Sequence, residues 1–169
     1  MNLCGSLCLQ LSRCTVVPFS LYLLSNLRHM YQKDYILRMI EMLGKMIAGI
    51  LGLIKKGDFE QAENKLEDVY FSMLKEDSAF FRDIAVDELT DKLLHGHNYT
   101  NGHLEVLAEL FYAEAELRLA KDDKPGTLEY SQKSLRLFEF IDTEYKTYSR
   151  ERIDKIAAIK ERIKTLEGV

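Results

Sequence analysis

Three histidines lie within one short segment, HGHNYTNGH, at positions 95, 97 and 103. Imidazole nitrogens are common ligands of Zn²⁺ and Ni²⁺, and one of these rings could instead act as a base. Glu105 could supply a fourth ligand. The spacing matches no structural zinc pattern, and the glycines and asparagines equally predict a connection between helices. Two hypotheses follow: a metal or small-ligand site at His95, His97 and His103, and a loop that binds nothing.

A second group of polar side chains follows at helical spacing: Glu105, Glu109, Tyr112 and Glu116. Residues three and four apart share one face of a helix, so these side chains form one polar edge, with Arg118 flanking it. The edge could bind a cation or a basic peptide, or it could simply face solvent. A di-iron site is excluded, because it needs Glu-x-x-His on two helices and no acidic residue here precedes a histidine by three.

Motifs for other chemistry are absent from the sequence. There is no glycine-rich phosphate loop, no His-Glu-x-x-His, and no cysteine after residue 14 that could act as a nucleophile. The sequence therefore predicts a protein that is not an enzyme and that needs no cofactor.

The polar edge needs a helix to hold it, and residues 101–120 are predicted to form that helix, with Asn101 as its N-cap. Apolar residues fill two further rows, so the helix is apolar on most of its circumference and must be contacted on several sides. We expect a central rod with one wet edge. The two rows are Leu104, Leu107, Ala108, Phe111, Ala115 and Leu119, and Val106, Leu110, Ala113, Leu117 and Ala120.

Similar periodicity predicts about six helices, the others covering roughly 34–56, 59–73, 78–95, 124–142 and 150–166. Gly57 ends the first helix and Asp58 caps the second, so this short turn makes the two helices antiparallel neighbours. We expect a bend between residues 142 and 149. The last helix has only a narrow apolar stripe, which is typical of a solubilising end cap: Ile153, Ile156, Ile159, Ile163 and Leu166.

Charge is distributed unevenly along the 169 residues, whose net charge is −4. Residues 30–142 hold 14 basic and 22 acidic side chains, a net of −8, whereas residues 143–169 hold seven and five, a net of +2. An acidic body argues against nucleic acid as a partner, because phosphate binding needs a basic face.

Residues 1–29 differ from the rest, because they contain all three cysteines and no acidic residue. The uncharged run 14–27 is 14 residues long, too short to span a bilayer, and no signal-peptide cleavage site follows it. We predict a poorly ordered or non-native extension, translated from an upstream start codon, ahead of a helical domain at 30–169. Weak membrane anchoring is the alternative. A body without cysteine favours the cytoplasm.

Two segments resemble each other: LIKKGDFEQAENKL at 53–66 and LAKDDKPGTLEYSQKSL at 119–135. Each resembles the helix–turn–helix unit of tetratricopeptide (TPR) repeats. Gly57-Asp58-Phe59 and Ala62 stand where that repeat has its turn and its small residue, and Phe111 and Ala115 match the large-then-small pair of its first helix. Asp122 replaces the turn glycine.

Small residues at Ala115 and Ser134 would let antiparallel helices approach closely. Residues 30–166 also resemble a family of small bacterial proteins with a TPR-like fold, and that resemblance implies no activity.

The resulting expectation is an all-α fold of antiparallel helical hairpins, stacked as a short TPR-like array or bundle. The first functional hypothesis is a cytoplasmic adaptor whose acidic, helix-lined groove binds a protein or peptide, basic in character, through Glu105, Glu109, Tyr112, Glu116 and Arg118. The alternative is a metal or small-ligand protein using His95, His97 and His103. No nucleic acid and no membrane is expected as a partner, and the apolar first helix could also serve homo-oligomerisation.

Overall fold

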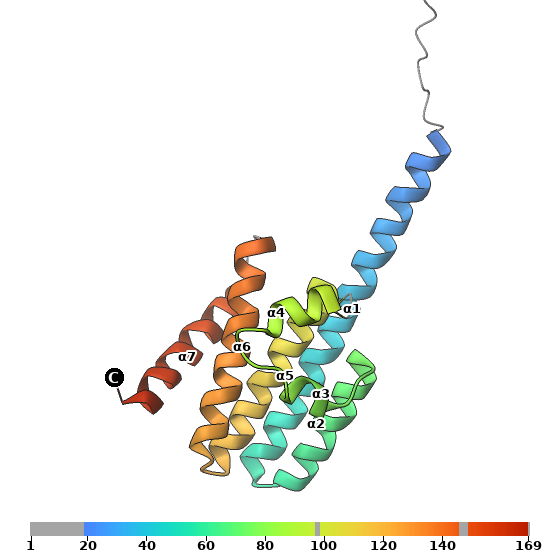
Figure 1. Ribbon diagram of the computed structural model, residues 1–169. Coiled ribbons are helices and arrows are strands. Elements are labelled where there is room, and N and C mark those ends of the chain that lie inside the picture. Colours follow the sequence, from blue (N-terminus) through green and yellow to red (C-terminus); the bar gives the residue numbers. More distant parts are fainter. Residues whose placement is uncertain (1–18, 97–98, 146–148, 169) are drawn as a thin grey trace, which may run out of the picture. The chain divides into compact units, whose positions relative to one another are not determined.

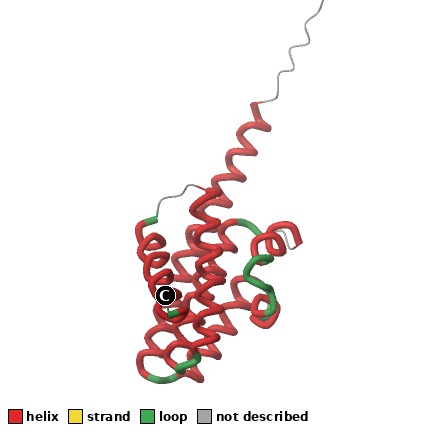
Figure 2. Tube along the Cα trace, turned by 60° about the vertical axis from the view of Figure 1, so that its left-hand side comes forward, coloured by secondary structure: helices red, strands yellow, loops and turns green. Residues whose placement is uncertain are grey.

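The computed structural model describes the backbone of residues 19–96, 99–145 and 149–168, and the side chains of residues 38–96, 99–144 and 149–168. The chain divides into two compact units, Met1–Tyr35 and Ile36–Val169, and every described side chain belongs to the second. All regular elements in the described ranges are helical, which confirms the predicted all-α fold (Figures 1 and 2). The predicted division at residue 29 stays a prediction.

Seven α-helices and one π-helical turn follow one another along the described chain. They are α1 (Phe19–Lys56), α2 (Phe59–Leu74), α3 (Ser78–Arg82), α4 (Leu89–Asp91), the turn η1 (Lys92–Gly96), α5 (Asn101–Ala120), α6 (Lys124–Tyr145) and α7 (Arg150–Glu167). None of the described helices is both long and apolar enough to cross a membrane.

Helix α1 begins at Phe19, well before the expected start near Asp34. No glycine or proline occurs between these two positions, so nothing in the sequence interrupts the helical backbone there. Its end is as expected: Gly57 takes a left-handed backbone with φ of 78°, and the Asp58 carboxylate accepts a hydrogen bond from the Gln61 amide at 3.3 Å. The predicted turn between the first two helices is confirmed.

The single helix expected at 78–95 is wrong, because the structure breaks it into α3, α4 and η1. The break follows Arg82, whose side chain turns inward and whose carbonyl oxygen accepts a hydrogen bond from the Lys133 ammonium of α6. A carbonyl that is satisfied by a side chain no longer needs an amide from the next turn, so the helix can end there. Ala85, expected to be buried, is exposed.

Helix α5 is the interior rod that the sequence predicted. Nine of its apolar side chains are buried, namely Leu104, Val106, Leu107, Ala108, Leu110, Phe111, Ala113, Ala115 and Leu117. It packs against α2 on one side and α6 on another. The structure differs from the expectation at both ends of α5: the N-cap is Thr100, not Asn101, and Leu119 and Ala120 at the C-terminal end are exposed, Leu119 to 45%.

Helices α5 and α6 form a second hairpin, closed by a turn in which Asp122 has a φ of 58°. Asp122 thus adopts the left-handed conformation that Gly57 adopts in the first hairpin, at the position where the repeat pattern expects glycine. One of the two small residues expected to permit a close approach does so: the buried Ser134 hydroxyl of α6 donates to the Ala108 carbonyl of α5 at 2.9 Å.

The last helix, α7, begins after Ser149, whose hydroxyl accepts from the Arg152 amide at 3.3 Å. The bend expected at 142–149 falls largely on residues 146–148, which lie outside the described residues. The expected apolar stripe is only partly right. Ile159 is buried, but Ile153 is 42% exposed and Arg152 is buried in its place. The reason is an ionic contact with α5, described below.

Candidate functional site: an acidic cleft between α1, α5 and α7

A cleft of about 330 Å³ opens between three helices of the second unit. Its wall on α1 is largely apolar, and carboxylates and an aromatic ring of α5 stand opposite. The N-terminal half of α7 supplies the third side. The lining residues are Ile40, Leu43, Gly44, Ile47, Ala48 and Leu51 of α1, Glu105, Glu109 and Tyr112 of α5, and Ser149, Glu151, Arg152 and Lys155 at the start of α7.

Three of the predicted contact residues therefore line one cleft, but they do not face open solvent as a wet edge would. Side chains of α7 meet the glutamates of this edge. Arg152 lies 3.2 Å from Glu105, and the Lys155 ammonium donates to both carboxylate oxygens of Glu109, at 2.7 and 2.8 Å. Glu116, the fourth predicted residue, accepts a hydrogen bond from Arg162 farther along.

Tyr112 lies between two of these ion pairs and touches both cations. Its ring centroid is 5.8 Å from the Lys155 ammonium and 5.7 Å from the Arg162 guanidinium, which places both charges over its face. Burial, and then the neighbouring Glu116, raise the pKa of the Tyr112 phenol. The ring therefore stays neutral and available to the cations at physiological pH.

Of the three glutamates in these pairs, Glu109 is the least exposed, at 18%. Burial raises the pKa of Glu109, although Lys155 opposes the shift. Burial alone would lower the pKa of Lys155, but the attraction of Glu109 and Glu151 outweighs it, so the pKa of Lys155 is raised. The ammonium is thus held in its charged form by the two glutamates.

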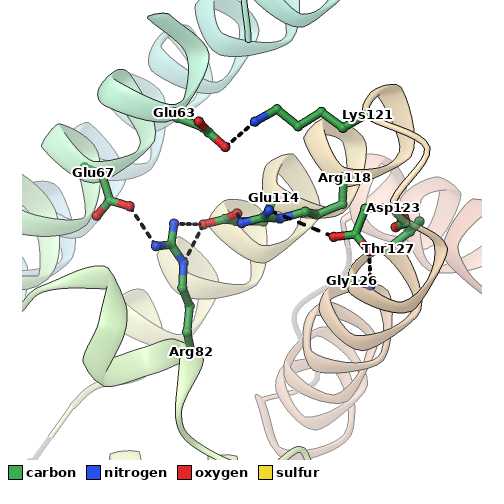
Figure 3. Close-up of polar contacts among 9 residues, drawn as sticks. All are labelled: Glu63, Glu67, Arg82, Glu114, Arg118, Lys121, Asp123, Gly126 and Thr127. Carbon is green, nitrogen blue, oxygen red and sulfur yellow. Dashed lines mark hydrogen bonds and ion pairs between the residues drawn. The ribbon is translucent and has the colours of Figure 1, made fainter. Parts of the chain in front are cut away.

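Arg118, the fifth predicted contact residue, lies elsewhere, which corrects the expectation that it flanks the edge. Two residues along a helix turn about 200°, so Arg118 projects from the other side of α5 than Glu116 does. Its guanidinium lies 4.0 Å from Glu114 and 3.9 Å from Asp123, over the ring of Tyr130. It belongs to a second polar cluster, which Figure 3 shows.

The second cluster is built around Glu114, whose side chain is completely buried (Figure 3). One carboxylate oxygen accepts hydrogen bonds from two nitrogens of Arg82, with Nε at 3.0 Å. Glu67 of α2 approaches the same guanidinium at 2.8 Å. The cluster therefore ties α2, α3 and α5 together. Nearby, Lys121 pairs with Glu63 and joins the second hairpin to the first.

Burial raises the pKa of Glu114, and Arg82 and then Arg118 oppose that shift. Burial would lower the pKa of Arg82, but Glu114 and Glu67 outweigh it and raise the pKa. Each charge in this cluster is therefore retained because the opposite charge is in contact with it, which is the condition for keeping ions away from water.

Four tyrosines make stability sensitive to alkaline pH. The pKa of each is raised, chiefly by burial: Tyr70, Tyr99, Tyr112 and Tyr130. The unfolded chain then loses protons near pH 10 before the folded chain does, so stability is complete below that pH and falls above it. The raised pKa of Lys155 acts in the same direction.

We expect Tyr70→Phe to reduce this alkaline loss, because Tyr70 is fully buried and its hydroxyl has no hydrogen-bond partner among the described residues. A single phenol of this kind costs about 1.4 kcal/mol per pH unit above its unfolded pKa. Urea unfolding at pH 8, 10 and 11 measures the slope. An unchanged slope in the variant would contradict the assignment.

The structure describes two of the three histidines of the metal hypothesis, His95 and His103, so that hypothesis stays a prediction. His103 Nδ1 accepts from the Thr100 amide at 3.1 Å and contacts its hydroxyl at 2.8 Å, completing an N-terminal cap for α5. His95 is exposed, and His97 lies outside the described residues. No set of three or more potential metal ligands comes together among the side chains that the structure describes. Burial lowers the pKa of His103, which suits a neutral, capping imidazole.

Two parts of the site escaped the sequence analysis. The cations of α7 could have been found from the net charge of +2 on residues 143–169, which complements the acidic body. Glu114 could have been found from its neighbours, since it follows Leu110 by four residues and precedes Leu117 by three, inside an apolar row.

Comparison of the chain with protein-family models, with curated proteins and with solved structures gives no match.

Proposed function

We propose that this chain is a non-enzymatic adaptor, and that its cleft between α1, α5 and α7 binds a basic, amphipathic segment of a partner protein. The observation that carries the proposal is the pairing of an apolar wall with carboxylates in one cleft. Apolar residues of α1 face Glu105 and Glu109, and three glutamates line the cleft against two cations. An apolar face flanked by cationic residues complements such a surface.

The arrangement of hairpins supports a TPR-like stack as the scaffold of this adaptor. The α1–α2 and α5–α6 hairpins both turn on a left-handed residue, Gly57 and Asp122. Ala62 and Thr127, which follow these turns by five residues, are both fully buried. We assign the protein to the cytoplasm as part of the same proposal, because all its cysteines precede the helical domain.

The polar groups of the cleft support a binding role over a catalytic one. Glu109 and Lys155 satisfy each other at 2.7 Å, and Arg152 satisfies Glu105 at 3.2 Å. The net charge left to attract a basic partner comes from the excess of three carboxylates over two cations in the cleft, and Glu151, the third carboxylate, is 80% exposed. A general base would instead need a proton acceptor that is not already neutralised.

Ala48→Lys tests the cleft, because Ala48 is an exposed residue on its α1 wall. The probe is a fluorescently labelled amphipathic leucine–lysine peptide, followed by fluorescence anisotropy. We expect salt-sensitive binding to the unaltered chain and a Kd raised about three- to tenfold by the added charge. Ala158→Lys is the matched control: it adds the same charge at an exposed alanine of α7 outside the cleft, and it should leave the Kd unchanged.

Two results would count against the cleft. One is an equal loss of affinity in both lysine variants, which would reflect net charge alone. The other is equal binding of a leucine–glutamate peptide of the same length, which would show that the carboxylates do not select the partner.

A further inference from the structure

Helix α7 contacts α5 in a regular register. The ion pairs join residues 105 with 152, 109 with 155 and 116 with 162, at sequence separations of 47, 46 and 46. A nearly constant separation means that the two helices run parallel. A basic helix thus lies along the acidic edge of α5, with one cation for each of three glutamates.

Few apolar contacts accompany these ion pairs. Ile159 is the one aliphatic side chain of the described α7 that is fully buried, and Ile156 and Ile163 are half-buried. The Arg162–Glu116 and Lys155–Glu109 pairs retain access to solvent, so salt and competing charges can weaken them. By comparison, α5 buries nine apolar side chains. The contact of α7 is therefore more open to competition than the packing of α5 is.

The surface under α7 has two parts, which together we name the α7 seat. Glu105, Glu109, Tyr112 and Glu116 of α5 form its acidic part, and the side of α6 that α7 packs against forms the rest. In a stack of hairpins, a helix parallel to α5 at this end occupies the place of the first helix of a further hairpin. A helix from another protein can occupy that place equally well if it carries the same pattern.

We propose that the α7 seat is itself an interaction surface, and that α7 is its built-in occupant, replaced by a helix of a partner protein. The partner helix runs parallel to α5 and carries cations at positions i, i+3 and i+10 with an aliphatic residue at i+7. That pattern is the one formed by Arg152, Lys155, Ile159 and Arg162. The proposal rests on the proposed function in assigning a protein partner of basic character. The seat shares Glu105, Glu109 and Tyr112 with the cleft, but it adds Glu116 and the side of α6 and does not include the apolar wall of α1.

Two substitutions that break the same ion pair give opposite expectations. Lys155→Glu loosens α7 and leaves the carboxylates of the seat intact. Glu109→Lys also loosens α7, but it replaces a carboxylate of the seat with a positive charge. The probe is a labelled synthetic peptide covering residues 149–168, added to the full chain and followed by fluorescence anisotropy. We expect Lys155→Glu to bind the peptide at least about tenfold more tightly than the unaltered chain. The reason is that the chain's own α7, which competes with the peptide at a millimolar effective concentration, binds the seat more weakly in this variant.

We expect Glu109→Lys to gain nothing, although its α7 is equally loosened. Amide hydrogen exchange checks that condition: protection of α7 should fall in both variants while protection of α5 persists. Lys124→Glu, at an exposed residue of the first turn of α6, controls for the change in net charge and should bind the peptide like the unaltered chain.

The proposal is overturned if Lys155→Glu gains no affinity, if Glu109→Lys gains as much, or if α7 stays fully protected in both. The proposed function fails separately, through Ala48→Lys. If Ala48→Lys gives the expected result and the peptide experiment does not, the adaptor function stands and only the proposal of a replaceable α7 is lost.

Discussion

Glu114→Gln is expected to lower the free energy of unfolding by about 3 kcal/mol, although glutamine has nearly the same size. Glu114 is completely buried and holds the Arg82 guanidinium through two hydrogen bonds. Removing one partner of a buried ion pair typically costs about 3–5 kcal/mol, because the other charge is left without compensation. Arg82 is partly exposed and keeps Glu67, so we place the loss at the lower end of that range.

The matched control is Glu67→Gln, because both glutamates pair with the same arginine. Glu67 is 46% exposed, so its ion pair with Arg82 is screened by water. We therefore expect Glu67→Gln to change the free energy of unfolding by about 0–1 kcal/mol. Urea unfolding followed by circular dichroism measures both variants. Equal losses at the two positions would show that burial does not decide the strength of the Arg82 contacts.

Phe111→Ala is expected to cost about 3–5 kcal/mol, the range for deleting a fully buried aromatic side chain. Phe111 lies at the centre of α5, with ring centroids of Tyr70 at 6.5 Å and Tyr130 at 6.0 Å. The Lys133 ammonium lies 5.7 Å above its ring. The alanine would leave a cavity that helices on both sides of α5 cannot fill without moving.

Phe71→Ala provides the comparison, because the same side chain is 61% exposed on α2. We expect a change within about 0.5 kcal/mol there, since little apolar surface is returned to water. Thermal unfolding at one protein concentration compares the two variants. A loss at Phe71 as large as that at Phe111 would mean that α2 packs against something other than the described unit.

Helical periodicity was enough to predict the rod at 101–120, the turn at Gly57 and Asp58, and the hairpin that ends in α6. These features depend on residues three or four apart or on a single glycine, so they can be read from a short window of sequence. The same reasoning failed at residues 78–95. There the break depends on Lys133, which is 51 residues away from the Arg82 carbonyl that it satisfies.

The acidic edge of α5 likewise combines a feature that the sequence predicts with one that it does not. The spacing of Glu105, Glu109, Tyr112 and Glu116 placed them on one face, and the structure brings the first three to one cleft. The sequence did not say what would meet that face. The core must position both α5 and α7 before their side chains can pair in register. Ile159 and Arg152 are buried in that packed arrangement.

By itself, then, the amino-acid sequence determined that the fold is helical, where the rod at 101–120 and the turn at Gly57 and Asp58 lie, and that acidic and basic charge lie in different parts of the chain. Only the tertiary structure decided that the basic segment covers the acidic edge, that Arg118 lies against Glu114, Asp123 and Tyr130, and that a glutamate in an apolar row pairs with Arg82. The physical reason is range. Helix formation and capping act between neighbours in sequence, whereas burial and ion pairing act between whichever groups the packed core brings into contact.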